Sequence, residues 1–191
     1  MLAPTSEIPR DAARAPGWAS LLERFYLRLG LPLPAIHELG GEDVPQPYRG
    51  MLVHSSDMTP TLELFYQQPM SLSVLSREQQ DYAYLREVIL KCSNDRRPVE
   101  YGVIRISLNH LPAPARLHVL EEQKPLGSIL QSETIAHLSW PQAFFRLQSD
   151  PHLAHVLHCR QPEQLYGRRN VLLDGSRRLL AEVIEILAPV P

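Results

Sequence analysis

Apolar residues along the chain follow two different spacings, and the spacing predicts which segments are helices and which are strands. Between residues 18 and 29 the apolar side chains recur at helical intervals, and Gly30 directly afterwards is typical of a helix end. A second helix is expected over 57–67, where Pro60 suits the first turn, and a third over 112–120. These three segments supply the clearest helical signals in the sequence.

Strands are predicted where apolar and polar residues alternate, or where branched and aromatic residues crowd together. Segments 70–76, 82–92 and 97–108 fit this description. A polar turn at 93–97 separates the last two, so they are expected to form a hairpin. Strands that pair with near neighbours, with helices clustered between them, indicate an α+β fold with a mostly antiparallel sheet.

The segment 128–164 carries a mixed pattern. It predicts a strand near 131–138 and then helices, whose apolar faces would use Phe144, Phe145, Leu147, Leu153, Val156 and Leu157. Residues 1–16 are rich in proline, alanine and charge and are expected to form a loose arm. Residues 17–191 then form a single domain.

The end of the chain, residues 165–189, predicts a second hairpin around the turn pair Asp174-Gly175. Its second arm looks buried on both faces, yet each face holds one carboxylate, Glu182 or Glu185. A buried carboxylate needs a partner. One of these acids could face a ligand, and the other a salt-bridge partner or the outside of the sheet.

Arg86 raises the same question with the opposite charge. It lies in the strand 82–92, which is apolar on both faces, and an unpaired buried charge there costs several kcal/mol. One interpretation is a structural ion pair with Glu87, Glu182 or Glu185. The other is an anionic ligand, because a guanidinium matches a carboxylate through two parallel hydrogen bonds. Arg105 raises the question more weakly.

Composition narrows the class of protein. The chain has 191 residues, of which 44% are hydrophobic, and its net charge of −2 predicts no nucleic-acid partner. The two cysteines are far apart and favour free thiols in a reducing compartment. There is no signal-like apolar segment at the start and no stretch long enough to span a bilayer. We therefore expect a soluble, cytoplasmic protein without a membrane partner, either a monomer or a homodimer.

Several motifs, taken together, resemble those of the chorismate lyase family from Met58 to the end of the chain. They are "DMTPTLELFYQQ" with "SLSVLS", "YLREVIL", the strand from Gly102 to Leu111, "KPLGSIL" and "LYGRRNVLLDGSRRLLAEVIEILAP", in the order of the family. The resemblance implies a six-stranded antiparallel sheet with helices that enclose a ligand cavity.

The resemblance also implies a set of site residues. Arg86 would bind a ligand carboxylate, Leu126 would offer a backbone group, and Met58 would line the site. Glu185 corresponds to the family's carboxylate four residues before the terminal proline, which leaves Glu182 with a structural role. Three departures stand out. Val103 occupies the position after Gly102 where the family often has arginine, so that Arg105 could substitute. The segment 127–166 is longer than in the family, and 58–86 is shorter.

The implied activity is that of a carbon–oxygen lyase, which eliminates pyruvate from chorismate or a close analogue to give 4-hydroxybenzoate. It needs no cofactor and no metal. Arg86 would anchor the ring carboxylate, and Glu185, with a raised pKa, would act as hydrogen-bond donor or general acid.

The alternative function is a non-catalytic protein that binds a small aromatic acid on the same scaffold, since related domains sense small ligands in transcription regulators. Residues 1–50 are too short and proline-rich for a winged helix, which argues against a regulator. Either way the expected partner is a small aromatic or enolpyruvyl carboxylic acid.

A metal site is not expected. His152, His155 and His158 recur every three residues beside Cys159. At about 100° per residue these side chains spread over roughly a third of a helix circumference, so zinc would need a tighter cluster or another ligand.

Overall fold

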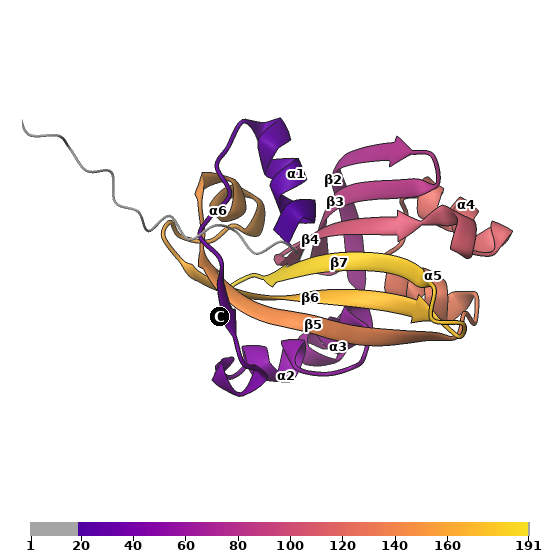
Figure 1. Ribbon diagram of the computed structural model, residues 1–191. Coiled ribbons are helices and arrows are strands. Elements are labelled where there is room, and N and C mark those ends of the chain that lie inside the picture. Colours follow the sequence, from indigo (N-terminus) through magenta and orange to yellow (C-terminus); the bar gives the residue numbers. More distant parts are fainter. Residues whose placement is uncertain (1–18, 191) are drawn as a thin grey trace, which may run out of the picture.

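A seven-stranded antiparallel sheet organises the part of the chain that the computed structural model describes, residues 19–190. The order of strands in the sheet is β1-β5-β6-β7-β4-β3-β2 (Figure 1). The strands are β1 (His37–Leu39), β2 (Met70–Gln80), β3 (Ala83–Cys92), β4 (Pro98–Ser107), β5 (His137–Gln148), β6 (Gln164–Asp174) and β7 (Leu179–Leu187). The α-helices are α1 (Ser20–Leu29), α2 (Tyr48–Leu52), α3 (Met58–Tyr66), α4 (Ala113–Glu121), α5 (Leu126–Ser132) and α6 (Pro151–Leu157).

The α+β prediction is confirmed, and both predicted hairpins are present as β3–β4 and β6–β7. The helices predicted at 18–29, 57–67 and 112–120 correspond to α1, α3 and α4. The sheet has one strand more than the six expected, and the additional strand is the three-residue β1, which pairs with β5 at the edge. The predicted arm, residues 1–16, lies outside the described residues, and the single domain stays a prediction.

The prediction for 128–164 is wrong in part. Residues 126–132 form helix α5, and Phe144, Phe145 and Leu147 lie in the long strand β5 rather than in a helix. Pairing with β6 along the whole of β5 decides this conformation. Pro141 is tolerated because β1 covers only residues 144–146, so that Pro141 lies where β5 is an edge strand.

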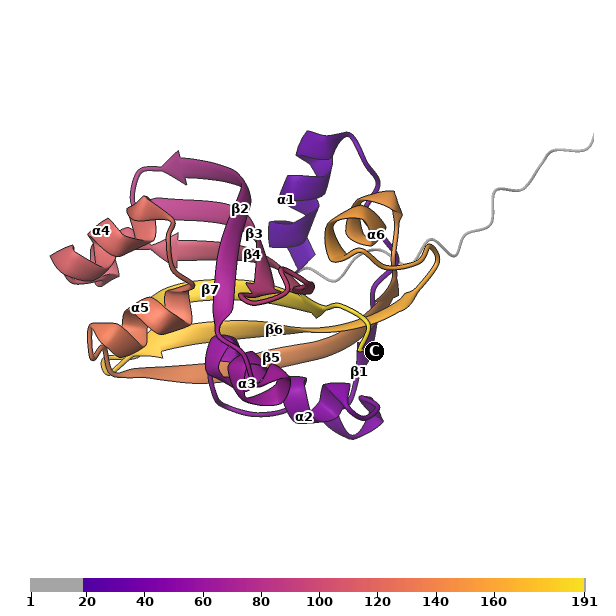
Figure 2. The same ribbon diagram turned by 180° about the vertical axis from the view of Figure 1, so that it is seen from behind.

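Helices cover both faces of the sheet. On one face, the far face, α1 and α6 pack on a core cluster that includes Leu85, Val103 and Ile184. On the other, the near face, α2 and α3 cover one end and α4 and α5 the other, each pair with its own cluster (Figure 2). Because each pair of helices has a separate cluster, the near face is the place where a space can open between two core clusters. No helix in residues 19–190 is long and apolar enough to cross a bilayer.

The far face contains one buried acid, Glu87, which is 3% exposed. Its carboxylate accepts hydrogen bonds from Tyr101 Oη (2.9 Å), His152 Nε2 (2.8 Å) and Ser76 Oγ (2.8 Å). Burial alone would raise the pKa of Glu87, but these three donors outweigh it and lower the pKa below its ordinary value. The ionised form of Glu87 therefore stabilises the packing of α6 and the strand edge on this face.

Replacement of Glu87 by Gln should lower the free energy of unfolding at pH 7 by about 1–3 kcal/mol, because it weakens a buried network. Because the folded-state pKa is depressed, the contribution of Glu87 is complete above the unfolded-state value near 4.5 and disappears as the pH falls below it. Urea unfolding from pH 7 to pH 3 should show the two proteins converging. Glu182→Gln, in a half-buried pair, is the control with a smaller effect.

Gly167 in β6 lies where its two neighbouring strands, β5 and β7, approach it closely. A Cβ atom there would lie 2.5 Å from the backbone oxygen of Glu185 and 2.6 Å from Cζ of Phe145. Gly167→Ala should therefore reduce the free energy of unfolding by about 1–3 kcal/mol or more, measured by denaturant unfolding. Gly175→Ala is the matched control, because a Cβ at Gly175 meets nothing within 4 Å, and an equal loss in both variants would contradict this account.

Candidate ligand-binding site

A pocket lies on the near face, between the middle of the sheet and the first turns of α3 and α5. About 60 Å³ of space within it is open to a water-sized molecule. Its wall is mostly apolar and includes Leu72, Val88, Leu90, Ile104, Leu126, Leu172 and Val183. The charged side chains among its lining residues are Asp57, Arg86, Glu100 and Glu185.

Strand register sets the floor of this pocket. Arg86 of β3 pairs with Ile104 of β4, and Gly102 of β4 pairs with Glu185 of β7. Because side chains alternate between the two faces of a strand, Arg86, Gly102 and Glu185 all contribute to the near face. Gly102 has no side chain, and the side chains of Val88 and Glu100 lie close over it, 3.1 and 3.3 Å from the position that a Cβ would occupy.

Arg86 is 1% exposed, and its Nε and Nη1 atoms are buried without a hydrogen-bond partner. In the part of the chain described here it forms no ion pair. Desolvation lowers the pKa of the guanidinium, yet an arginine stays charged in a protein. The pocket therefore contains a buried positive charge without a bound carboxylate, an arrangement that costs several kcal/mol.

The three acids that could have neutralised Arg86 are bound elsewhere. Glu87 belongs to the network on the far face. Glu182 pairs with Arg169, with 2.7 Å between Oε1 and Nη2. This also answers the question of the two acids in β7. Glu182 has the structural role that the sequence left to it.

Glu185 lines the pocket but is bound to Arg168, its direct cross-strand neighbour in β6. Glu185 Oε2 lies 2.5 Å from Arg168 Nε, and both side chains are almost completely buried. Glu185 therefore stands in a buried, charge-assisted hydrogen bond with Arg168, where the resemblance implied a hydrogen-bond donor or general acid to the ligand.

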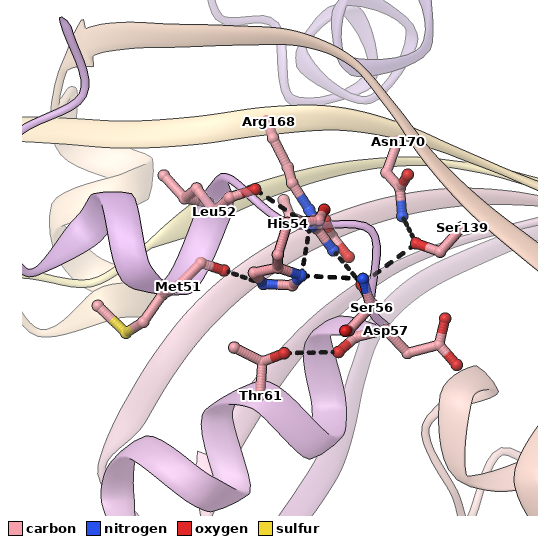
Figure 3. A network of polar contacts seen from close by, with 10 residues as sticks. Met51, Leu52, His54, Ser56, Asp57, Thr61, Ser139, Arg168 and Asn170 are labelled. Atoms are coloured by element: carbon pink, nitrogen blue, oxygen red, sulfur yellow. Dashed lines mark hydrogen bonds and ion pairs between the residues drawn. The ribbon is translucent and has the colours of Figure 1, made fainter. Parts of the chain in front are cut away.

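Arg168 also fixes the loop that leads into α3 (Figure 3). Its guanidinium donates to the backbone oxygens of Leu52 (3.2 Å), His54 (3.2 Å) and Ser56 (3.3 Å). Burial of the His54 imidazole, and then the positive charge of Arg168, lower the pKa of His54. Arg168 thus connects the sheet, through Glu185, with the loop before α3.

The roof of the pocket begins at Asp57, the N-cap residue of α3. Its carboxylate does not cap the helix but accepts from His137 Nε2 of β5 at 2.9 Å, and this bond raises the pKa of His137. Met58 and Leu126, both predicted as site residues, line the pocket as the first residues of α3 and α5. The loop, α3 and β5 are thus tied together above the floor.

Sequence reasoning missed one site residue, Glu100 of β4. It is 4% exposed, it lines the pocket, and its Oε2 atom has no hydrogen-bond partner. Desolvation, together with the negative charge of Glu185, raises the pKa of Glu100 well above its ordinary value. The signal was present, because an acid inside the apolar segment 98–107 is as unusual as Arg86.

The structure brings together four of the five predicted site residues: Met58, Arg86, Leu126 and Glu185. Arg105 does not join them. It is exposed, it lies on the far face near α1, and its cross-strand neighbour is Glu182. Strand alternation gives the reason, because Val103 and Arg105 point away from the face that Gly102 and Ile104 share.

Among residues 19–190, no group of three or more histidine, cysteine, aspartate or glutamate side chains could hold a metal ion. His152, one of the three histidines considered as ligands, binds Glu87 instead. Ring contacts with Tyr26 and Tyr101 enclose it on the far face.

Comparison with known proteins bears on the fold of the chain. No family model matches the sequence, and no curated protein matches it. PhnF from Mycobacterium smegmatis is similar in structure, with a TM-score of 0.53 and 10% sequence identity over 72% of this chain and 66% of that one. The chain therefore spans just under two thirds of that protein.

The effector domain of PhnF, solved separately, has a TM-score of 0.52 and 9% identity over 70% of this chain and 88% of that one. A GntR-family transcriptional regulator from Bacillus cereus matches at a TM-score of 0.44 and 11% identity, over 63% of this chain and 92% of that one. The likeness to PhnF and its effector domain is consistent with a chorismate lyase-like fold, whereas neither name supports chorismate lyase itself.

Two expectations are corrected by these neighbours. The prediction of a carbon–oxygen lyase is contradicted by the likeness to PhnF and its effector domain, neither of which is named as an enzyme. In the site itself, Glu185, the residue expected to donate a proton, is bound to Arg168. The expectation that no nucleic acid is a partner is contradicted by the same likeness.

Substitution by methionine should change the free energy of unfolding in opposite directions at the two buried arginines of the near face, Arg86 and Arg168. Arg86→Met removes an unpaired charge and should raise the free energy of unfolding of the ligand-free protein by about 1–3 kcal/mol. Arg168→Met leaves Glu185 buried without its partner and should lower it by about 3–5 kcal/mol. Denaturant unfolding measures both values, and an equal loss in the two variants would contradict this description of the site.

Proposed function

We propose that the protein is a non-catalytic binding protein for a small aromatic carboxylic acid, which Arg86 holds through its carboxylate. The single observation that supports this is the buried guanidinium with two unpartnered nitrogen atoms in an apolar pocket. A carboxylate accepts two parallel hydrogen bonds from such a group and neutralises its charge. The ligand carboxylate then supplies the hydrogen-bond acceptors and the negative charge that Arg86 lacks in the empty pocket.

The walls of the pocket favour an aromatic or similarly flat apolar body for this acid. Leucine, isoleucine and valine side chains from β2, β3, β4, β6 and β7 surround the space beside Arg86. At Gly102 the absence of a side chain leaves room for Val88 and Glu100, whose side chains lie 3.1 and 3.3 Å from the position of a Cβ there. Met58 and Leu126 close the opposite side, and Leu126 stands in this proposal as a contact with the ligand.

The likeness to the effector domain of PhnF supports binding rather than catalysis. A binding protein needs no free acid in its pocket, so the pairing of Glu185 with Arg168 is compatible with this role. Arg168 then keeps the loop before α3 in place over the ligand. The expected cytoplasmic location and the monomer or homodimer stay predictions.

Benzoate and 4-hydroxybenzoate should raise the thermal unfolding temperature of the protein, because a ligand that binds only the folded state stabilises it. Arg86→Met should reduce the affinity by on the order of tenfold to a hundredfold, the loss expected for hydrogen bonds to a charged group. Arg105→Met is the matched control, because its charge lies on the far face, and it should bind like the wild type.

Two results would contradict the proposal. One is a wild-type protein that none of these acids stabilises, and the other is an equal loss of binding in Arg86→Met and Arg105→Met. Incubation with chorismate adds a separate test, in which no pyruvate should form above the uncatalysed rate. Pyruvate formation would contradict the non-catalytic role while leaving the binding site in place.

A further inference from the structure

Glu100 places a second polar group in the pocket, away from Arg86. It lies four residues before Ile104, the partner of Arg86 across the β3–β4 pair. At a rise of 3.2–3.4 Å per residue, this puts the two positions roughly 13 Å apart along the strand. Gly102 lies between them. The polar groups thus stand at two ends of an apolar floor.

The carboxyl group of Glu100 bends toward the middle of this floor. Its Oε1 atom lies 3.3 Å from the position that a Cβ of Gly102 would occupy, and its Oε2 atom is buried without a partner. Glu185 flanks the same glycine from β7. Glu100 and Glu185 thus lie on the same face near Gly102, and only Glu185 is paired with an arginine.

The charges in the pocket determine the form of Glu100. Arg168 and Glu185 neutralise each other, and Arg86 lies at the other end of the floor. A second carboxylate beside Glu185 would be both buried and repelled, so the pKa of Glu100 is raised well above its ordinary value. At neutral pH Glu100 is then an uncharged carboxylic acid, which has an O–H group to donate.

We propose that Glu100 determines the specificity of the site by donating a hydrogen bond, as a neutral acid, to an oxygen at the end of the ligand remote from its carboxylate. This inference rests on the proposed function. It narrows the ligand to aromatic carboxylates with a carbonyl or ether oxygen at the far end. Once the pairs Glu185–Arg168 and Asp57–His137 are set aside, Arg86 carries the remaining charge of the pocket when Glu100 is neutral, which matches a ligand with a single negative charge.

A ligand with an ammonium group at the far end is the competing possibility. It would have to ionise Glu100 and lose its own hydration in an apolar pocket. The charge of Glu185 gives it little help, because Arg168 already neutralises that charge. The structure therefore favours the neutral acceptor, and the ammonium serves as one arm of the test.

Isothermal titration calorimetry at pH 7 can compare four ligands on the wild-type protein. They are benzoate, 4-acetylbenzoate, its apolar isostere 4-isopropylbenzoate, and 4-(aminomethyl)benzoate. The acetyl compound should bind on the order of tenfold more tightly than the isopropyl compound, because only its oxygen can accept from Glu100. The aminomethyl compound should bind more weakly than the acetyl compound.

Two variants assign this preference to Glu100. Glu100→Gln still offers N–H donors and should keep most of the preference for the acetyl compound. Glu100→Leu, which places an apolar side chain among Leu90 and Leu187, should bind the acetyl and isopropyl compounds with about equal affinity. A circular dichroism spectrum and a cooperative thermal unfolding transition like those of the wild type show that Glu100→Leu is folded.

The outcomes separate this inference from the proposed function. If benzoate binds in an Arg86-dependent manner but the acetyl preference is absent, or survives in Glu100→Leu, the role of Glu100 is wrong and the binding function stands. Tighter binding of the aminomethyl compound overturns the neutral-donor role in the same way. If none of the four acids binds to the wild type, the proposed function fails, and the inference about Glu100 fails with it.

Discussion

The uncompensated charge of Arg86 is the constraint on which the near face depends. The sheet holds this guanidinium between apolar side chains, and the acids that could neutralise it are bound to other partners. A protein that retains such a charge gives up stability in the empty state, and a bound carboxylate restores it. The space beside Arg86 is therefore explained best as a binding site, in which the ligand offsets the cost of burying the guanidinium charge.

Arg168 also places a buried positive charge on the near face, but its partners lie within the protein. Its charge is neutralised by Glu185, and its remaining donors bind three backbone oxygens of the loop before α3. The side chain thus joins the sheet to the segment that covers the pocket. Two buried arginines on one face of the sheet have different roles, since one is completely paired and the other is left open for an anion.

The carboxyl groups show a similar division. Glu87 and Glu182 serve the far face, where donors or an arginine surround them. Glu185 is bound to Arg168, whereas the Oε2 atom of Glu100 has no partner, and burial and the charge of Glu185 raise the pKa of Glu100 well above its ordinary value. Identical side chains therefore differ in protonation because of the groups that the strand register places beside them.

The sequence by itself determined the α+β class, both hairpins, and the fact that Arg86 and Glu185 occupy positions where a charge is unfavourable. Local spacing and turn chemistry are enough for such statements, because they depend on near neighbours along the chain. Only the tertiary structure decided that β5 extends through 144–147, that Arg105 lies on the far face, and that Glu185 is bound to Arg168. The partners involved are separated by long stretches of sequence, and the register of seven strands, which no local pattern specifies, sets which side chains meet.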